Sequence, residues 1–151
     1  MVAQFHYQFN SPVLGTPQIP EFNRTQLRVD LITEELDELI EAIVKRDLVA
    51  IADALCDLQY VLSGAILEFG MSQIFGQLFS EVHRSNMSKA CVTEQEAEAT
   101  VAHYKAQNVK SYFAKYLNDT YNVYRLTDNK TLKSVNYSPA DLLPIIEKAQ
   151  Q

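Results

Sequence analysis

Hydrophobic side chains recur at intervals of three and four residues along two long stretches that contain no proline, residues 22–46 and 47–69. Their apolar members are Ile32, Leu36, Leu39, Ile40, Ile43, Leu48, Ile51, Leu55, Leu58, Leu62 and Ile66. Residues at this spacing share one face of a helix, so the pattern predicts two amphipathic helices, each with a buried stripe. Asp47 is a good N-cap for the second helix, and Gly70 is expected to end it.

Shorter elements are expected on both sides of this helical pair. Residues 1–21 are predicted to be irregular, because three prolines interrupt them. A third helix is expected over residues 72–89 with Ser72 as its cap. A fourth is expected over 93–107, with Thr93 as its cap and a glutamate that completes a capping box.

The C-terminal part has a different pattern. Aromatic and β-branched residues surround Asn118-Asp119 within residues 112–124, which indicates a β-hairpin, although its turn lacks glycine. Ser138 and Pro139 are expected to open a last short helix that includes Ile146. The tyrosines of this region are interpreted as hairpin packing, with a base-stacking platform as the alternative.

Composition supports a helical fold in one domain, residues 1–151. The chain has 151 residues, 47% of them hydrophobic, with only four glycines and five prolines. We therefore predict an all-α fold in which an antiparallel helical hairpin and a third helix form a bundle on oligomerisation. A small C-terminal β-hairpin is inserted into this fold.

Charge and cysteine content restrict the expected partners. The net charge of −6 and the absence of a basic run disfavour nucleic acid and anionic membranes. The longest apolar run is expected to be too short to span a membrane. Cys56 and Cys91 form no disulfide framework, and no signal-like N-terminus is seen, so a cytoplasmic location is expected.

Carboxylates gather on one side of each predicted central helix. Glu34, Glu35 and Glu38 lie within an arc of about 100° on the first helix. Asp53 and Asp57 are stacked four residues apart on the second, where like charges repel. Apolar residues lie within or beside both acidic faces, so the carboxylates are expected to be half-buried and to need a partner.

A tight turn at residues 45–47 would make the two helices antiparallel. Glu38 and Asp53 are almost equally far from this turn, so the two acidic faces should meet. Carboxylates that converge in this way need a cation to stay ionised, and hard oxygen ligands suit Mg²⁺ or Mn²⁺. The alternative is that the glutamates of the first helix form an ordinary solvated face.

The third predicted helix ends with residues suited to phosphate and base contacts. Arg84, Asn86 and Lys89 offer a guanidinium, an amide and an ammonium group. Cations are also favoured at any helix C-terminus, which is a purely structural explanation. Lys130 and Lys133 are a second candidate phosphate-binding pair, and a solvated loop explains them equally well.

These motifs resemble the all-α nucleoside triphosphate pyrophosphohydrolase superfamily, which includes MazG, dimeric dUTPases, dCTP pyrophosphatases and phosphoribosyl-ATP pyrophosphohydrolases. The signature of this superfamily is EExxE followed by ExxD. The first half is intact at residues 34–38, whereas Ala54 replaces the glutamate that should precede Asp57 by three positions. Segments 81–89 (EVHRSNMSK) and 128–141 also resemble the MazG-like and phosphoribosyl-ATP pyrophosphohydrolase-like members, and residues 92–126 resemble an insertion.

The resemblance implies a set of site residues. Glu35, Glu38 and Asp57 would bind Mg²⁺, with Asp53 in place of the missing glutamate. Glu34 would bind a second metal ion or orient the attacking water, and Glu34 or Glu38 would accept its proton. Arg84, Asn86 and Lys89 would contact the substrate.

The implied activity is hydrolysis of a (deoxy)nucleoside triphosphate to monophosphate and pyrophosphate, by a homodimer or homotetramer. Two alternatives stay open: phosphoribosyl-ATP hydrolysis, and a noncatalytic helical nucleotide-binding or interaction protein. A di-iron bundle is disfavoured because neither central helix contains histidine.

Overall fold

The computed structural model describes the backbone of residues 1–151 and every side chain except that of residue 117. This described part contains six α-helices, 58% of the chain, and one two-stranded antiparallel sheet, so the mostly helical fold with a small sheet is confirmed. Two compact units divide the chain, Met1–Gly76 with Pro144–Gln151 and Gln77–Leu143, and each is described by itself. The expectation of a single domain stays a prediction.

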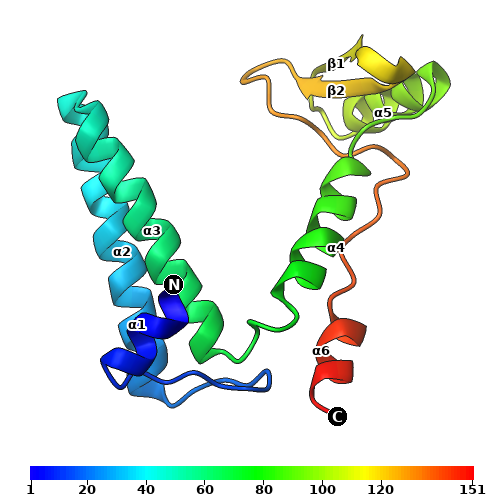
Figure 1. The fold of residues 1–151 in the computed structure, drawn as a ribbon. Coiled ribbons are helices and arrows are strands. Elements are labelled where there is room, and N and C mark those ends of the chain that lie inside the picture. Colours follow the sequence, from blue (N-terminus) through cyan, green and yellow to red (C-terminus); the bar gives the residue numbers. More distant parts are fainter. The chain divides into compact units, whose positions relative to one another are not determined.

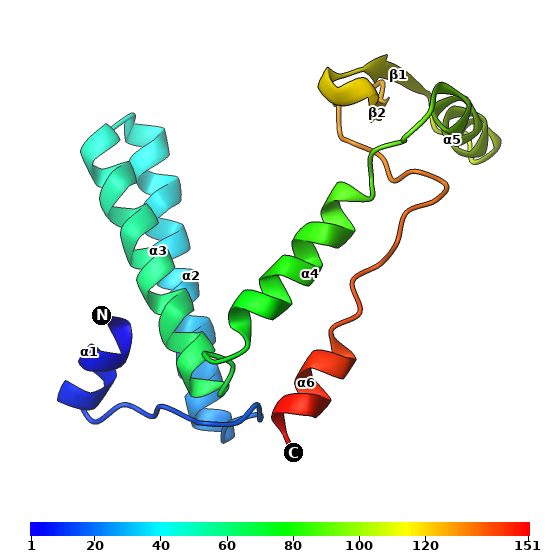
Figure 2. The same cartoon turned by 45° about the vertical axis from the view of Figure 1, so that its right-hand side comes forward.

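The first unit is built on the helical hairpin expected from the sequence. α2 (Phe22–Lys45) and α3 (Leu48–Glu68) lie side by side in both views (Figures 1 and 2). Arg46 takes a left-handed conformation at the turn, with φ of 56°. The Asp47 carboxylate accepts hydrogen bonds from the amides of residues 49 and 50 at 3.0 and 3.1 Å, which confirms Asp47 as the N-cap.

A helix that the sequence did not indicate precedes this hairpin. α1 (Val2–Gln8) forms within the stretch expected to be irregular, so that prediction was wrong for these residues. The prolines begin only at Pro12, which leaves room for two helical turns. His6 on α1 is 2% exposed, and its Nδ1 donates to the Pro12 carbonyl at 2.8 Å.

The end of α3 is closed by the segment after α1. The amides of Leu14 and Gln18 donate to the carbonyls of Leu67 and Phe69 at 3.0 and 3.1 Å. Gly70 follows with φ of +69°, and a Cβ there would lie only 1.9 Å from the Thr16 carbonyl oxygen. Glycine is therefore required on two grounds, backbone conformation and space.

A buried ionic group lies at the same end of the hairpin. Glu68 is fully buried and accepts from the Arg28 guanidinium at 2.6 Å and from Arg24 Nε at 3.0 Å. A second nitrogen of Arg24 also contacts the Glu68 carboxylate. Burial of a charge is tolerated when it is paired and hydrogen-bonded in this way.

The second unit contains α4 (Phe75–Met87, which begins in the first unit), α5 (Glu94–Ala106) and a hairpin of β1 (Ser111–Lys115) and β2 (Tyr121–Arg125). The strands pair antiparallel, with Phe113 opposite Val123. Its core comprises Cys91, Ala97, Val123 and Leu132. Asn118 and Asp119 both take positive φ in the connecting 3-10 turn, Leu117–Asp119, which replaces the missing glycine.

Three ends of two helices differ from the sequence-based prediction. α4 starts at Phe75 instead of Ser72, because a turn with a bond from the Ile74 amide to the Met71 carbonyl precedes it. It ends at Met87 instead of Lys89. The last helix, α6 (Leu143–Ala149), starts after Ser138, because the backbone of that residue is bonded to the Ser88 hydroxyl.

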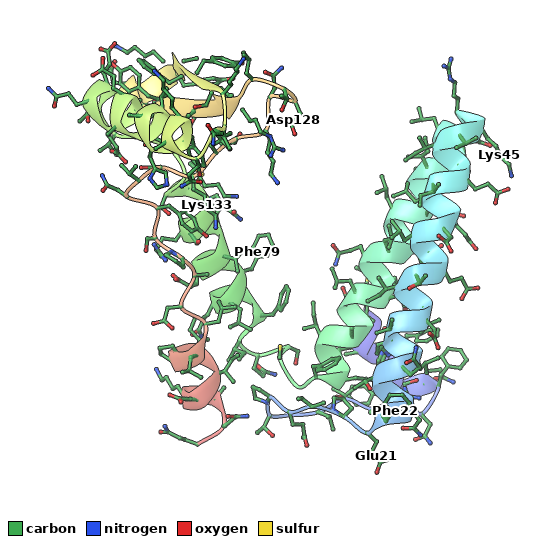
Figure 3. All side chains as sticks on the ribbon, turned by 180° about the vertical axis from the view of Figure 1, so that it is seen from behind. Glu21, Phe22, Lys45, Phe79, Asp128 and Lys133 are labelled. Atoms are coloured by element: carbon green, nitrogen blue, oxygen red, sulfur yellow. The ribbon has the colours of Figure 1, made fainter. Side chains whose placement is uncertain are left out.

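Much of the apolar stripe on the central hairpin remains exposed. Six of its members are 45–78% exposed: Leu36, Ile40, Ile43, Leu48, Leu55 and Leu62. Side chains project along the length of α2 between the labelled Phe22 and Lys45 (Figure 3). These positions are not buried in the single chain, and their burial in an oligomer stays a prediction.

α3 is also more apolar than expected. It has 21 residues and a mean hydropathy of 1.4, which is long and apolar enough to cross a membrane by length and composition. A core helix of a soluble protein meets the same criterion, but only 17% of this window is buried in the single chain. α3 also carries the exposed carboxylates Asp53 and Asp57.

Candidate functional site

The predicted carboxylates lie in the middle of the two hairpin helices. Glu34, Glu35 and Glu38 are on α2, and Asp53 and Asp57 are on α3. Four of the five are exposed, and Glu35 is partly buried. The expected half-burial was therefore wrong for these four carboxylates, whose side chains extend from the hairpin into solvent.

The electrostatics of Glu35 show that the two acidic faces interact. The pKa of this carboxyl is raised, first by desolvation and then by repulsion from Asp57, Glu38, Glu34 and Asp53. Two of these four groups belong to the opposite helix. The antiparallel hairpin therefore brings the glutamates and aspartates into one negative cluster.

A cleft of about 250 Å³ opens beside this cluster toward the helix turn. Glu38 and Asp53 line it together with Ala54, which is only 3% exposed. Lys45 also lines the cleft, but its ammonium group is paired with Glu41 at 2.6 Å. Where the superfamily signature has a glutamate, the wall here is the methyl group of Ala54, and Asp53 is the neighbouring carboxylate.

The chemistry of these groups suits a hard divalent cation. All of the donors are carboxylate oxygens, and their mutual repulsion raises the Glu35 pKa. Among the described side chains, no three His, Cys, Asp or Glu residues are close enough to form a ready-made metal site. Mg²⁺ completes its shell with water and phosphate oxygens, so a group of carboxylates that forms no closed cage is compatible with it.

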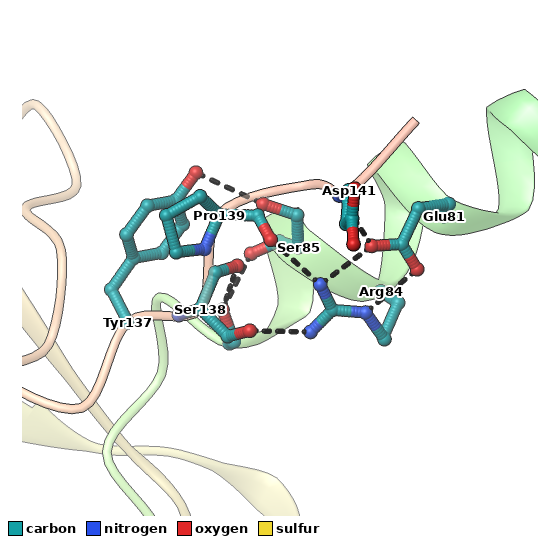
Figure 4. A network of polar contacts seen from close by, with 8 residues as sticks. Glu81, Arg84, Ser85, Tyr137, Ser138, Pro139 and Asp141 are labelled. Carbon is teal, nitrogen blue, oxygen red and sulfur yellow. Dashed lines mark hydrogen bonds and ion pairs between the residues drawn. The ribbon is translucent and has the colours of Figure 1, made fainter. Parts of the chain in front are cut away.

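Arg84 belongs to the second unit, where it joins α4 to the C-terminal segment (Figure 4). Its Nε and one Nη donate to Glu81 at 2.8 and 2.7 Å. The guanidinium also donates to the Ser138 hydroxyl at 3.0 Å and to the Pro139 carbonyl at 2.9 Å. Four of its five N–H donors are thereby engaged, which gives Arg84 a structural role in this conformation.

Glu81 is the acceptor at the centre of this network. Its carboxylate binds Arg84 and also accepts from the Asp141 amide at 2.9 Å. These bonds lower the pKa of Glu81 to about 2, with the Arg84 hydrogen bond as the main cause. The network therefore remains ionised over the neutral and mildly acidic pH range.

The other predicted substrate contacts also lie in the second unit. Lys89 Nζ donates to the Asn86 side chain at 2.8 Å. Lys133 Nζ lies 4.2 Å from the centre of the Tyr137 ring, in a cation–π arrangement. The backbone of Lys130 takes part in the turn at Asp128. Substrate contact by these residues stays a prediction.

Sequence reasoning missed the buried polar residues at the α1 end of the hairpin. His6, Arg28 and Glu68 are 2%, 8% and 0% exposed. A signal was present, since Arg28 falls between Leu27 and Leu31 in an apolar stretch of α2. A charged residue in such a position needs a buried partner.

Comparison with known proteins gives two matches. A sequence model described as phosphoribosyl-ATP pyrophosphohydrolase matches residues 2–86, more than half of the chain. An uncharacterized protein of Acanthamoeba polyphaga mimivirus is 38% identical over 76 residues. That match covers 47% of this chain and 30% of the viral protein, so the chain accounts for less than a third of the length of this relative.

Proposed function

Because the chain belongs to the phosphoribosyl-ATP pyrophosphohydrolase family, within the MazG-like superfamily, we propose that it hydrolyses a (deoxy)nucleoside triphosphate to monophosphate and pyrophosphate with Mg²⁺. The family indicates a nucleotide pyrophosphohydrolase, a hydrolase acting on acid anhydrides. The observation that carries the proposal is the negative cluster of Glu35 with its four carboxylate neighbours across the helical hairpin.

Each carboxylate has a proposed role. Glu35, Glu38, Asp53 and Asp57 hold Mg²⁺, with Mn²⁺ as a substitute. The ion, when bound, neutralises phosphate charge and lowers the pKa of a coordinated water. Glu34, which is exposed at the edge of the cluster, orients the attacking water, and Glu34 or Glu38 accepts its proton.

The cluster and the predicted substrate contacts come from different units of the chain. We propose that Arg84, Asn86 and Lys89, together with Lys130 and Lys133, contact the nucleotide. For Arg84 this requires exchanging bonds to Ser138 and Pro139 for bonds to a phosphate, a change that charge-assisted hydrogen bonding favours.

Phosphoribosyl-ATP is the second candidate substrate, and the description of the matching family favours it. Both substrates carry a nucleotide anhydride, so the same carboxylate cluster would serve. Pyrophosphate release from dUTP, dCTP, dTTP and phosphoribosyl-ATP, measured side by side, separates the two. Turnover of phosphoribosyl-ATP alone would favour the second candidate.

A noncatalytic nucleotide-binding or interaction protein is supported by Ala54, which removes one carboxylate from the signature. Titration calorimetry with Mg²⁺ and a nonhydrolysable nucleotide addresses this alternative. Binding without turnover of any substrate in the panel would favour it, and Mg²⁺-dependent turnover would exclude it.

The decisive experiment removes single carboxylates. Glu38→Gln and Asp57→Asn are expected to lower Mg²⁺-dependent turnover by about a hundredfold or more, because each neutralises a group that positions metal and water. Glu41→Gln is the control, since Glu41 is an exposed carboxylate on the same helix paired with Lys45. Wild-type turnover in both test variants, with their helical circular dichroism retained, would refute the site.

A further inference from the structure

A second pocket lies beside α1, where this helix packs against α3. Figures 1 and 2 show α1 at the end of the hairpin where α2 begins. It has a volume of about 290 Å³. Its walls come from α1, α2 and α3 and include Phe5, Arg28, Leu31, Tyr60 and Gly64. This volume is near the lower end of the range of about 300–1,000 Å³ found for small-molecule sites.

Arg28 and His6 line this mainly apolar pocket. Arg28 is 8% exposed, and Glu68 binds one nitrogen of its guanidinium at 2.6 Å. The Arg28 Nε is buried and has no hydrogen-bond partner among the described residues. An atom so enclosed is not reached by a ligand, and the candidate donor is therefore the Nη1 nitrogen of Arg28, which lies beside Gly64.

His6 supplies the complementary group. Its Nδ1 must donate to the Pro12 carbonyl, since a carbonyl only accepts, and the Nε2 of the neutral ring is therefore an acceptor. A Cβ placed on Gly64 would lie 2.7 Å from Arg28 Nη1 and 3.0 Å from His6 Nε2. A donor and an acceptor thus lie close together in the space that a side chain at residue 64 would take.

Aromatic rings form the wall nearest the surface. The rings of Phe5 and Tyr60 are 5.6 Å apart and nearly perpendicular, at 89°. Both are partly exposed, at 43% and 37%. A planar ligand can stack on such a wall, because aromatic faces favour offset or edge contacts with another ring.

The pocket adjoins the carboxylate cluster along both helices. Leu31 precedes Glu34 by three residues on α2, and Tyr60 follows Asp57 by three residues on α3. At a rise of 1.5 Å per residue, three residues span about 5 Å. The aromatic wall at Tyr60 therefore lies about one helical turn from the proposed phosphate site. Arg28 and Gly64 lie about two turns from it, since they are six residues from Glu34 and seven from Asp57.

We propose that this pocket binds the base of the nucleotide substrate, and that it selects a base whose edge has a carbonyl beside a ring N–H, as in uracil or thymine. The base carbonyl accepts from Arg28 and the ring N–H donates to His6. A phosphate is a poor occupant, because the walls are mainly apolar and Glu68 already offsets the Arg28 charge. This inference rests on the proposed function for the position of the phosphates.

Calorimetry with separate parts of the substrate tests the pocket without relying on turnover. The ligands are dUMP, dCMP and inorganic tripolyphosphate, which has no base, each in the presence of Mg²⁺. We expect dUMP to bind more tightly than dCMP. Gly64→Ala should weaken dUMP binding by about tenfold or more, because the new methyl group displaces Arg28 and His6, and should leave tripolyphosphate binding unchanged.

Gly76→Ala is the matched control, since it makes the same change in a helix where a Cβ meets no atom within 4 Å. Tyr60→Leu is a second test variant, which removes the aromatic wall and leaves the ionic group with Glu68 in place. It should also weaken dUMP binding selectively. Circular dichroism establishes that each variant is folded.

The outcomes separate this inference from the proposed function. Selective dUMP binding by a wild-type protein that hydrolyses no nucleotide would support the pocket and refute the enzyme. Unchanged dUMP binding in folded Gly64→Ala and Tyr60→Leu variants would overturn the pocket, whatever the turnover. An equal loss of dUMP and tripolyphosphate binding would also overturn it, because the pocket would then support only the phosphate site.

Discussion

At the scale of single residues, the pKa of Glu35 depends on all the other carboxylates of the cluster. It is the partly buried member, and both the loss of solvent and the four neighbouring carboxylates oppose its ionisation. Glu41, one turn after Glu38, shows the opposite case, since Lys45 lowers its pKa through a hydrogen bond and an ion pair. Two glutamates of one helix thus have pKa values shifted in opposite directions, upward inside the cluster and downward outside it.

The raised pKa of Glu35 predicts a dependence of stability on pH and Mg²⁺. The folded state binds the proton more tightly than the unfolded state, so stability should fall as pH rises above 4.5 toward the folded pKa. Glu35→Gln should remove this fall. A Mg²⁺ concentration about 100 times Kd should stabilise the wild type by about 2.7 kcal/mol through mass action, and the variant much less.

Thermal unfolding at several pH values, with and without Mg²⁺, measures these effects. Glu41→Gln is the control and should respond to Mg²⁺ like the wild type. Equal Mg²⁺ responses of the wild type and Glu35→Gln would contradict a role of Glu35 in metal binding.

At the scale of elements, the central hairpin follows from local signals. The apolar period, the Asp47 cap and the left-handed Gly70 each act over a few residues, so they are legible in the sequence. The opposition of the acidic faces followed from the turn position alone. The predicted start of α6 was wrong because it depends on contacts between residues far apart in the sequence. Arg84 and Ser88 form hydrogen bonds with Ser138, and α6 begins only after this residue.

The N-cap of α3 gives a prediction at this scale. Asp47→Ala should destabilise the protein by about 1 kcal/mol, because two amides of the first turn lose their acceptor. Chemical denaturation measures the change. Asp37→Ala, at an exposed position in the middle of α2, is the control, and a loss of the same size there would argue against a capping effect.

At the scale of the whole molecule, the open face of the hairpin is the dominant feature. Ile40, Ile43 and Leu55 are more than half exposed, and neighbouring apolar side chains extend this surface along both helices. Large exposed apolar patches on soluble proteins commonly mark contacts with other proteins. We propose that a second copy of the chain covers this face, in a homodimer or homotetramer.

Light scattering should therefore give a mass of two or four chains. Ile40→Lys should shift the distribution toward the monomer, because burial of its ammonium group at the interface is unfavourable. Gln26→Lys adds the same charge at an exposed polar position of α2 and should leave the mass unchanged. A monomeric wild type would exclude this assembly.

The closure of α3 by the first residues of the chain has a consequence for how the protein matures. The carbonyls of Leu67 and Phe69 receive their partners from Leu14 and Gln18, which are synthesised long before them. The two helices of the hairpin can therefore form before the carbonyls at the end of α3 are hydrogen-bonded. Those bonds form only when residues 14–18 fold back onto α3. We expect proteolytic cleavage near Gly15 to weaken these hydrogen bonds at the end of α3 and to expose the Glu68 carboxylate to water.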